Sequence, residues 1–277
     1  MKQSLLMLSA FILLIVASCS KSSDKPMSQT IPPEIGTFLL RDITYNGNSS
    51  IIAFKYNGLN VSQTLFSIYR DEMTLNSAGQ IESTTTYSVD NNSIYRFNKV
   101  YYGSNKKISK IEHSNAQKTI VYEVTDYIYD SSGRVTSITM NEGSKKSVSK
   151  YDYNSSGNVI VYTREIYLNG LLFSSDKVTN NQFDDKKNPL IEIKDFEYYL
   201  SLLYQSNYDR LGTPIYPTKN NPVQSTGASI YNGALRSGDI TSTWKYNSNG
   251  YPTENQFRSL VGGSLNVTYG FKYLIVK

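Results

Sequence analysis

From residue 34 onward the chain alternates apolar and polar positions in short runs. Tyr, Ile, Val and Thr are frequent in these runs, and clusters of Asn, Asp, Ser and Gly separate them. Short runs of β-branched and aromatic residues between turn-forming clusters are typical of β-strands. Long stretches at helical spacing are nearly absent. The pattern therefore predicts an all-β chain with about 13–15 strands.

One turn pattern recurs along the chain. Residues 129–135 (Tyr-Asp-Ser-Ser-Gly-Arg-Val), 153–159 (Tyr-Asn-Ser-Ser-Gly-Asn-Val) and 246–252 (Tyr-Asn-Ser-Asn-Gly-Tyr-Pro) share it. Each places an aromatic residue four positions before Gly, and Val or Pro two positions after it. We call these segments framed turns. Looser copies start at Leu75, Tyr102, Phe183 and Tyr208. Their near-regular recurrence indicates a repeat architecture.

The framed turns have a local physical explanation. The Asp or Asn side chain accepts hydrogen bonds from the backbone that follows and so starts the turn. The glycine supplies the positive φ that a tight hairpin needs. The turn glycines are Gly79, Gly133, Gly157, Gly212 and Gly250. The repeat predicts a long antiparallel up-and-down meander with one hairpin per repeat.

Residues 195–205 depart from the strand pattern. The apolar residues of this segment recur at helical spacing; they are Phe196, Tyr199, Leu200, Leu203 and Tyr204. Asp195 stands before them as a suitable N-cap. We expect one short helix here, followed by a loop rich in Pro and Asn, that covers part of the sheet. A helix that binds a partner is the alternative.

Residues 1–18 have the layout of a secretory signal, with a basic start, an apolar run and small residues before Cys19. Cys19 occupies the position that bacterial lipoproteins acylate, so we expect it to be lipidated. Several acyl chains would give stable membrane anchoring. Residues 19–36 read as a polar, flexible tether that ends in prolines. Residues 37–277 are expected to form a single β domain.

Charge and cysteine content narrow the possible partners. The 277-residue chain has a formal net charge of +5, and its charged residues are dispersed. Nucleic-acid-binding proteins carry clustered basic patches, so we expect no nucleic acid partner. Cys19 is the only cysteine, which excludes a disulfide framework and a thiolate metal site in the β domain. We expect no metal and no cofactor.

A single histidine limits the catalytic chemistry. His113 is interpreted as a surface residue at the end of a strand. Triads and zinc sites need histidine within a larger set, so we assign no catalytic residues and do not expect an enzyme. Glu192, Asp195 and Glu197 cluster in the sequence, and a glycosidase needs two carboxylates across a cleft. A carbohydrate-active hydrolase is the alternative if these three side chains share one cleft.

Aromatic residues near the framed turns are candidates for ligand stacking, because aromatic rings can pack on sugar rings. The candidates are Tyr127, Tyr129, Tyr151, Tyr153 and Trp244. Strand alternation places Tyr127 and Tyr129 on one face of the sheet, and likewise Tyr151 and Tyr153. The alternative is that these rings pack against neighbouring strands.

The framed turns at 129–135 and 153–159 resemble the YD repeats of Rhs-type and teneurin-type shells. The signal, the Phe-Asp-Asp-Lys-Lys-Asn-Pro segment at 183–189 and the Lys-Asn-Asn-Pro segment at 219–222 resemble Bacteroides-type lipoproteins of unknown function. The resemblance covers residues 38–277. It implies an antiparallel sheet that curls toward an open or barrel-like form in the cell envelope. It brings no catalytic residues.

We therefore expect an outer-membrane lipoprotein, on either the periplasmic or the surface face, that binds a glycan or an envelope protein. A structural shell or assembly component is the alternative; a free edge strand would favour it and a closed barrel would weaken it. A membrane-embedded barrel is disfavoured. Strand segments such as 150–153 and 163–166 place charge on both faces, which lipid-facing positions penalise.

Overall fold

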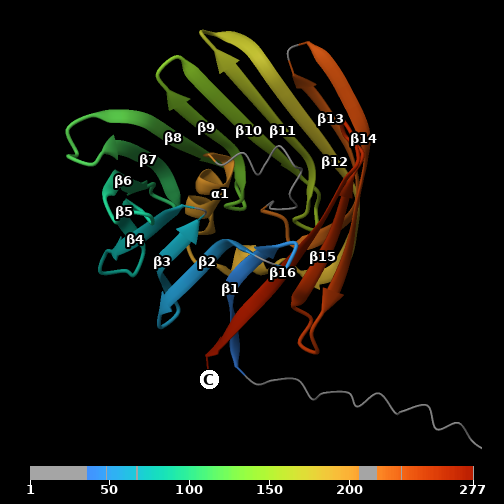
Figure 1. Cartoon of the computed structure of the whole chain (residues 1–277), viewed down its shortest axis with the longest axis horizontal. Helices are drawn as coiled ribbons and strands as arrows, with labels where there is room; N and C mark the ends of the chain where they lie inside the picture. Colours follow the sequence, from blue (N-terminus) through green and yellow to red (C-terminus); the bar gives the residue numbers. More distant parts are fainter. Residues whose placement is uncertain (1–35, 48, 67, 206–216, 232, 277) are drawn as a thin grey trace, which may run out of the picture. The chain divides into compact units, whose positions relative to one another are not determined.

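Sixteen strands in the described residues form one closed antiparallel barrel, in which β16 pairs with β1 (Figure 1). This computed structural model describes residues 36–47, 49–66, 68–205, 217–231 and 233–276. The first eight strands are β1 (Thr37–Tyr45), β2 (Ser49–Asn57), β3 (Asn60–Phe66), β4 (Tyr69–Leu75), β5 (Ile81–Ser88), β6 (Ile94–Tyr102), β7 (Ile108–Asn115) and β8 (Val121–Tyr129). The others are β9 (Val135–Glu142), β10 (Lys145–Tyr153), β11 (Val159–Leu168), β12 (Leu171–Lys187), β13 (Asn220–Tyr231), β14 (Ala234–Tyr246), β15 (Pro252–Ser259) and β16 (Leu265–Val276).

The all-β meander predicted from the sequence is confirmed. The structure has sixteen described strands where about 13–15 were expected. Strands β1 to β4 lie before the first turn that carries the recurring pattern, which joins β4 to β5.

The framed turns are hairpins with the expected bonding. In the turn between β8 and β9, Asp130 N–H donates to Arg134 O and Gly133 N–H donates to Asp130 O, both at 3.0 Å. The Asp130 carboxylate also accepts the N–H groups of Ser132 and Arg134 at 2.9 Å. Asn76, Asn154 and Asn247 play the same part in their turns. A positive φ is found at Gly79, Gly133, Gly157 and Gly250.

A β-bulge follows the framed turn between β6 and β7 and determines which side chains of β7 face inward. Tyr102 pairs with Ile108, whereas Tyr101 pairs with Lys110, so Ser109 is the extra residue. The extra residue reverses the alternation beyond it. His113 therefore points into the barrel and is completely buried. Its interpretation as a surface residue was wrong, because the bulge was not visible in the sequence.

The copy at 183–189 is not a hairpin, which corrects the sequence prediction. β12 continues through it as far as Lys187, which pairs with Asn220 of β13. Residues 188–219 are inserted at the point where the turn would be. The insertion includes a short 3-10 helix, η1 (Pro189–Glu192), and the helix α1 (Phe196–Gln205). The copy that starts at Tyr208 lies outside the described residues.

The two ends of the barrel differ because the meander strictly alternates. All framed turns lie at one end, together with the start of β1 at Thr37 and the end of β16 at Val276. We call this the framed end. The turns from odd-numbered to even-numbered strands lie at the other end, which we call the far end.

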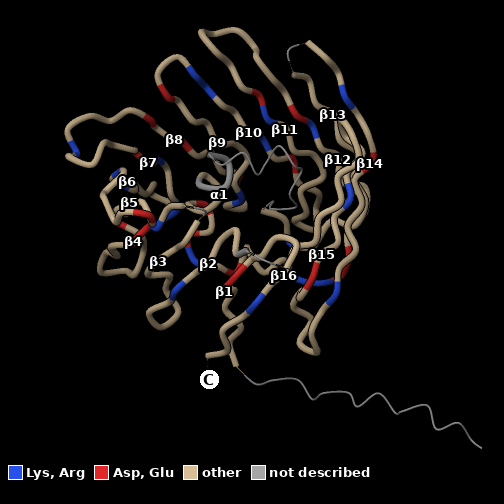
Figure 2. The backbone as a smooth tube through the Cα atoms, in the orientation of Figure 1, with Lys and Arg blue, Asp and Glu red and all other residues tan. Residues whose placement is uncertain are grey.

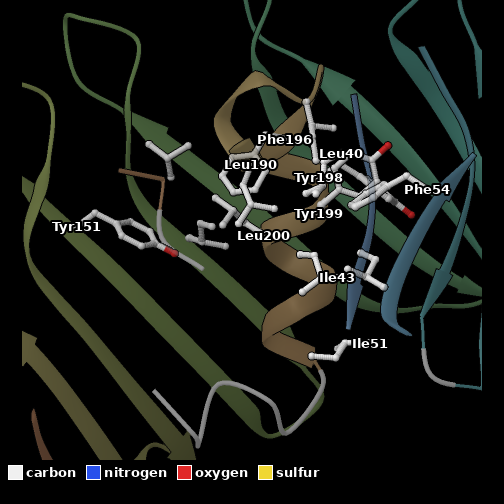
Figure 3. Packing of buried hydrophobic residues seen from close by; sticks show 14 of the residues in the cluster. Leu40, Ile43, Ile51, Phe54, Tyr151, Leu190, Phe196, Tyr198, Tyr199 and Leu200 are labelled. Carbon is white, nitrogen blue, oxygen red and sulfur yellow. The ribbon is translucent and has the colours of Figure 1, made fainter. Parts of the chain in front are cut away.

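Helix α1 confirms the helix predicted over residues 195–205 and packs inside the barrel wall (Figure 1). Leu40, Ile43 and Phe54 lie on one side of α1 and Tyr151 on the other (Figure 3). The helix residues Phe196, Tyr198, Tyr199 and Leu200 are all buried. Asp195 does not cap its own helix with its side chain. The Asp195 carboxylate instead accepts the N–H of Ile81 at 3.1 Å.

Charged residues occur along most of the strands (Figure 2). Lys110 and Glu112 of β7 alternate with the inward residues Ile111 and His113, so they point outward. Glu112 lies 2.7 Å from the ammonium group of Lys110 and accepts a 2.6 Å hydrogen bond from the hydroxyl of Tyr101. The described helices lack the length and hydropathy needed to cross a membrane.

Candidate functional site

A cavity of about 670 Å³ opens at the framed end of the barrel. Its walls come from the framed turns that follow β6, β8 and β10, and from the segment that leads from η1 into α1. Strands β6 to β11 are neighbours in the barrel, so the three turns stand side by side. The cavity exists because the insertion after β12 folds back over these turns.

The inner wall of the cavity is apolar. Ile108 and Val135, the first residues of two return strands, are almost completely buried. Tyr153 and Phe196 add aromatic rings, and the Tyr153 hydroxyl donates to the backbone oxygen of Val135 at 2.8 Å. The cavity therefore offers an apolar and aromatic wall held in place by strand ends.

Three carboxylates line this one cavity: Glu192, Asp195 and Glu197. Each has a partner. Glu197 lies 3.1 Å from the ammonium group of Lys107, and Glu192 lies 3.1 Å from that of Lys187. Asp195 accepts the N–H of Ile81, and burial raises the pKa of its carboxyl group. The cluster seen in the sequence is thus a cluster in space.

Five basic side chains line the same cavity: Lys106, Lys107, Arg134, Lys194 and Lys219. Arg134 lies 2.7 Å from the Asp130 carboxylate, and its guanidinium stands 4.6 Å from the centre of the Tyr153 ring. Lys194 donates to backbone oxygens, including that of Ala78 at 3.4 Å. The ammonium groups of Lys106 and Lys219 make no ion pair with any residue that the structure describes. Positive charge is therefore in excess around the cavity.

A buried polar network joins α1 to the barrel wall. The Tyr198 hydroxyl lies 2.7 Å from Thr84 Oγ1, donates to the Asp71 carboxylate at 3.2 Å, and accepts from the Asn98 amide at 3.2 Å. All four residues are buried, with Asp71 the most exposed of them at 5%. Burial raises the pKa of Asp71, against the opposing effect of the Arg96 guanidinium. The network positions helix α1, whose first residues, Phe196 and Glu197, line the cavity.

His113 extends this network on β7. Its Nδ1 lies 2.8 Å from Asn98 Oδ1, which accepts because the Asn98 amide nitrogen already donates to Thr84 and Tyr198. Burial, aided by the Arg96 guanidinium, lowers the pKa of His113 to about 3. Glu123 lies 3.2 Å from Nε2 and would favour the charged ring, but burial outweighs this contact. The neutral ring is a structural element of the barrel interior.

No family model matches the chain, and no curated protein matches it. Among solved structures, a porin-like protein from Bacteroides vulgatus is 12% identical, covers 87% of this chain and 100% of its own, and has a TM-score of 0.46. A porin-like protein from Bacteroides uniformis is also 12% identical, covers 86% of this chain and 96% of its own, and has a TM-score of 0.39. A TcdB2-TccC3-Cdc42 structure is 15% identical over 78% of this chain and 9% of its own, with a TM-score of 0.29. These values are too low for a conclusion about function, and the barrel topology rests on its own strand pairing.

The five aromatic residues predicted to stack on a ligand point into the barrel rather than outward. Tyr127 and Tyr151 are 7% and 2% exposed and belong to the core. Trp244 is half-buried, donates from Nε1 to the Pro222 backbone oxygen at 3.0 Å, and lies 5.7 Å from the Phe271 ring. Tyr129 and Tyr153 are partly buried against the same core. Tyr153 alone of the five lines the cavity.

The framing tyrosines follow a common bonding rule. The Tyr129 hydroxyl donates to the backbone oxygen of Ile108 at 2.7 Å, and Tyr153 bonds Val135 in the same way. Tyr102 repeats the contact with Ile81 at 3.0 Å. In each case a tyrosine ties its strand to the first residue of the preceding return strand. Packing between strands therefore accounts for the recurring spacing of these rings in the repeat.

The remaining predicted site residues are the turn glycines and Cys19. Gly133 and Gly157 line the cavity, whereas Gly79 and Gly250 lie in framed turns outside it. Cys19, the expected signal, most of the expected tether, and Gly212 lie outside the described residues. In the described part of the chain, no three His, Cys, Asp or Glu side chains gather in a way that could hold a metal ion.

The basic residues of the cavity were not predicted from the sequence. Lys107 and Arg134 occupy the same position of the repeat, directly after the glycine or its replacement. Adjacent repeats lie side by side in the barrel, so equivalent positions form a row at the framed end. Basic residues at one repeat position were the signal that could have revealed the site.

Proposed function

We propose that this chain is a lipid-anchored protein of the cell envelope that binds a glycan in the cavity at the framed end. The barrel serves as a rigid scaffold that holds the framed turns around the ligand. The observation that carries the proposal is the cavity itself, because about 670 Å³ lies within the usual range of small-ligand sites. Its aromatic wall and charged rim provide the stacking and polar contacts that sugars need.

The outer face of the barrel supports a place in water rather than in lipid. Lys110 and Glu112 face outward from the strands, as does Lys150 on β10. A lysine on a lipid-facing position near the membrane midplane costs about 2–4 kcal/mol. We therefore propose that only the lipid on Cys19 holds the protein at the membrane.

The anchor is tested by replacing the acylated residue. We expect Cys19→Ser to move the protein from the membrane fraction to the soluble fraction, with the barrel still folded by circular dichroism. Ser18→Ala, a neighbouring change that leaves the thiol in place, should not alter fractionation. Membrane association that survives Cys19→Ser would contradict the anchor.

Glycan binding is tested by filling the cavity. Ile191 lines the cavity and is 39% exposed, so Ile191→Trp should occupy part of it without disturbing the core. Ile128 is 60% exposed on a strand outside the cavity, and Ile128→Trp is the matched control. On a glycan array, the first variant should lose binding and the control should keep it. A blank array for the unmodified protein, with envelope proteins recovered in a pull-down, would favour a protein partner instead.

A hydrolase is the second candidate, because Glu192, Asp195 and Glu197 all line the cavity. The raised pKa of Asp195 suits a general acid, while the other two carboxylates each contact a lysine. Release of reducing sugar that Asp195→Asn abolishes would favour this function. The shell alternative has less support, since the described strands close into a barrel and offer no free edge for a neighbouring subunit.

A further inference from the structure

We infer that the cavity at the framed end selects an anionic saccharide, one that carries carboxylate or sulfate groups. This inference rests on the proposed function, because it names the class of glycan that the cavity would take. The recognition residues are Lys106 and Lys219, with Arg134 as a positioned third cation.

The charge balance of the cavity carries the inference. Five basic and three acidic side chains line it. Lys107 is neutralised by Glu197 at 3.1 Å, and Glu192 is paired with Lys187, which is not part of the lining. Asp195 is engaged by the Ile81 N–H, and burial raises the pKa of its carboxyl group. The surplus over the described residues is therefore positive. Lys194 contributes to it but donates to backbone oxygens, whereas the ammonium groups of Lys106 and Lys219 make no ion pair with a described residue.

Lys106 is placed at the rim by the turn itself. It occupies the glycine position of the framed turn after β6 and has a φ of 60°. A lysine in this left-handed conformation is strained relative to glycine, since its Cβ approaches the backbone. The side chain is exposed and lines the cavity. The turn thus keeps a cation where the other framed turns of the wall have glycine.

Lys219 reaches the same rim from the other side of the cavity. Its backbone N–H donates to Gly157 O, and its side chain crosses the face of Gly157, where a Cβ would meet it at 3.9 Å. Lys219 is the last residue of the inserted segment and directly precedes β13. The two lysines therefore come from separate parts of the chain and converge on one cavity.

Arg134 completes the cationic rim in a fixed orientation. Asp130 holds its guanidinium at 2.7 Å, and the Tyr153 ring supports it from one side. A planar guanidinium held in this way presents its remaining N–H groups in a defined direction, which suits carboxylate or sulfate oxygens. Tyr153 also lines the cavity, so the charged group and the aromatic ring that a saccharide would contact lie next to each other.

The experiment compares matched pairs of saccharides on the full-length protein in detergent. Each pair differs only in charge: uronic acid oligosaccharides against their methyl esters, and sulfated oligosaccharides against desulfated ones. We expect at least one acidic member to bind about tenfold more tightly than its neutral partner, and the difference to shrink as salt is raised. Lys106→Gln/Lys219→Gln should remove the preference. Lys150→Gln/Lys177→Gln removes the same charge from exposed outer positions of β10 and β12 and is the matched control.

The outcomes separate this inference from the function on which it rests. Equal binding of acidic and neutral members, or a preference for neutral ones, would overturn the charge selection and leave glycan binding in place. A preference that survives Lys106→Gln/Lys219→Gln would overturn the assignment to these lysines. Absence of binding to every saccharide would overturn the proposed function and this inference together. Circular dichroism of both double variants checks that the barrel remains folded.

Discussion

The two ends of the barrel are built on opposite plans. Near the framed end, the inward side chains are apolar or aromatic and pack against η1 and α1. Along the same strands toward the far end, the inward side chains become polar. On β7 the sequence runs from Ile108 and Ile111 to His113, and on β8 it runs from Tyr127 back to Glu123. On these two strands the inward side chains therefore change from apolar to polar within a few residues.

The tips of the far end reverse this order, because they expose apolar side chains. Most of the exposed large apolar residues in the described chain lie there: Ile68, Val89, Ile94, Tyr95, Ile120, Val121, Tyr122, Leu171, Leu172, Ile230, Tyr231, Leu235 and Leu260. The difference teaches that apolar content alone does not mark the core of this barrel. Burial of the side chain marks the core, and a stability measurement at each end can test that.

The largest expected effect is on the packing of α1. Leu200 is completely buried in the core cluster, whereas Leu171 at the far end is 76% exposed. We expect Leu200→Ala to lower the free energy of unfolding by about 2–5 kcal/mol, since it leaves a cavity. Leu171→Ala should change it by less than about 0.5 kcal/mol. Urea denaturation measures the free energy of unfolding of both variants. Equal losses would show that the two ends do not differ in how their apolar residues stabilise the fold.

The next effect concerns pH and the polar interior. The pKa of His113 is lowered to about 3 in the fold, against about 6.5 in the unfolded chain. Below pH 6.5 the unfolded chain therefore binds a proton that the folded chain does not bind. The contribution of the neutral His113 ring to the free energy of unfolding is complete above pH 6.5 and is lost as the pH falls toward 3. At pH 4 the loss amounts to roughly 3 kcal/mol. Denaturation curves across this range measure it.

The control for this prediction is His113→Gln, which cannot titrate. Its stability should fall less steeply with acid than that of the unmodified protein. Arg96, Glu123 and Asp71 also face this region from neighbouring strands, and the raised pKa of Asp71 acts in the opposite direction, but they are present in both proteins. Parallel pH profiles would show that His113 is not held neutral.

The parts of the fold that the sequence predicted are those set by neighbouring residues. Asp130, the glycines and the framing tyrosines bond within their own hairpins or to the adjacent one, so a short window contains the information. Helix α1 was likewise visible from the spacing of residues such as Phe196 and Leu200. Closure of the barrel was not visible in this way, because β1 and β16 are at opposite ends of the chain.

The candidate site depended on features that no short window contains. A single extra residue at Ser109 turned His113 inward, and bulges are not marked by a distinctive residue type here. The copy at 183–189 kept the turn pattern although an insertion replaces the turn. The cavity forms only when that insertion folds over turns that lie much earlier in the sequence. The three carboxylates stood out as a cluster in the sequence, and a shared cleft was considered only as an alternative; the surplus of basic residues was not predicted.

A smaller effect compares two turns that share the Asx bond. The Asp130 side chain accepts two backbone N–H groups and pairs with Arg134, whereas Asn115 at the far end accepts the N–H groups of Thr119 and Ile120 without an ion pair. We expect Asp130→Ala to cost about 1–2 kcal/mol and Asn115→Ala about 0.5–1 kcal/mol. Thermal unfolding of the two variants gives the difference. A larger loss at Asn115 would show that the charged pair adds nothing.

The smallest effect concerns two lysines that share an unfavourable backbone conformation. Lys106 at the framed end and Lys118 at the far end both have a φ of 60°. Glycine relieves this strain but increases the entropy of the unfolded chain, so Lys106→Gly should stabilise the protein by about 0.5 kcal/mol. Lys118 also places its ammonium group 4.0 Å from the centre of the Phe97 ring, and losing this cation–π contact should cancel the gain in Lys118→Gly. Calorimetry measures both changes. If Lys106→Gly raises stability and weakens binding of an acidic saccharide, the strain at this turn is retained for ligand binding. A gain in stability with unchanged binding would mean that Lys106 has no role in the cavity.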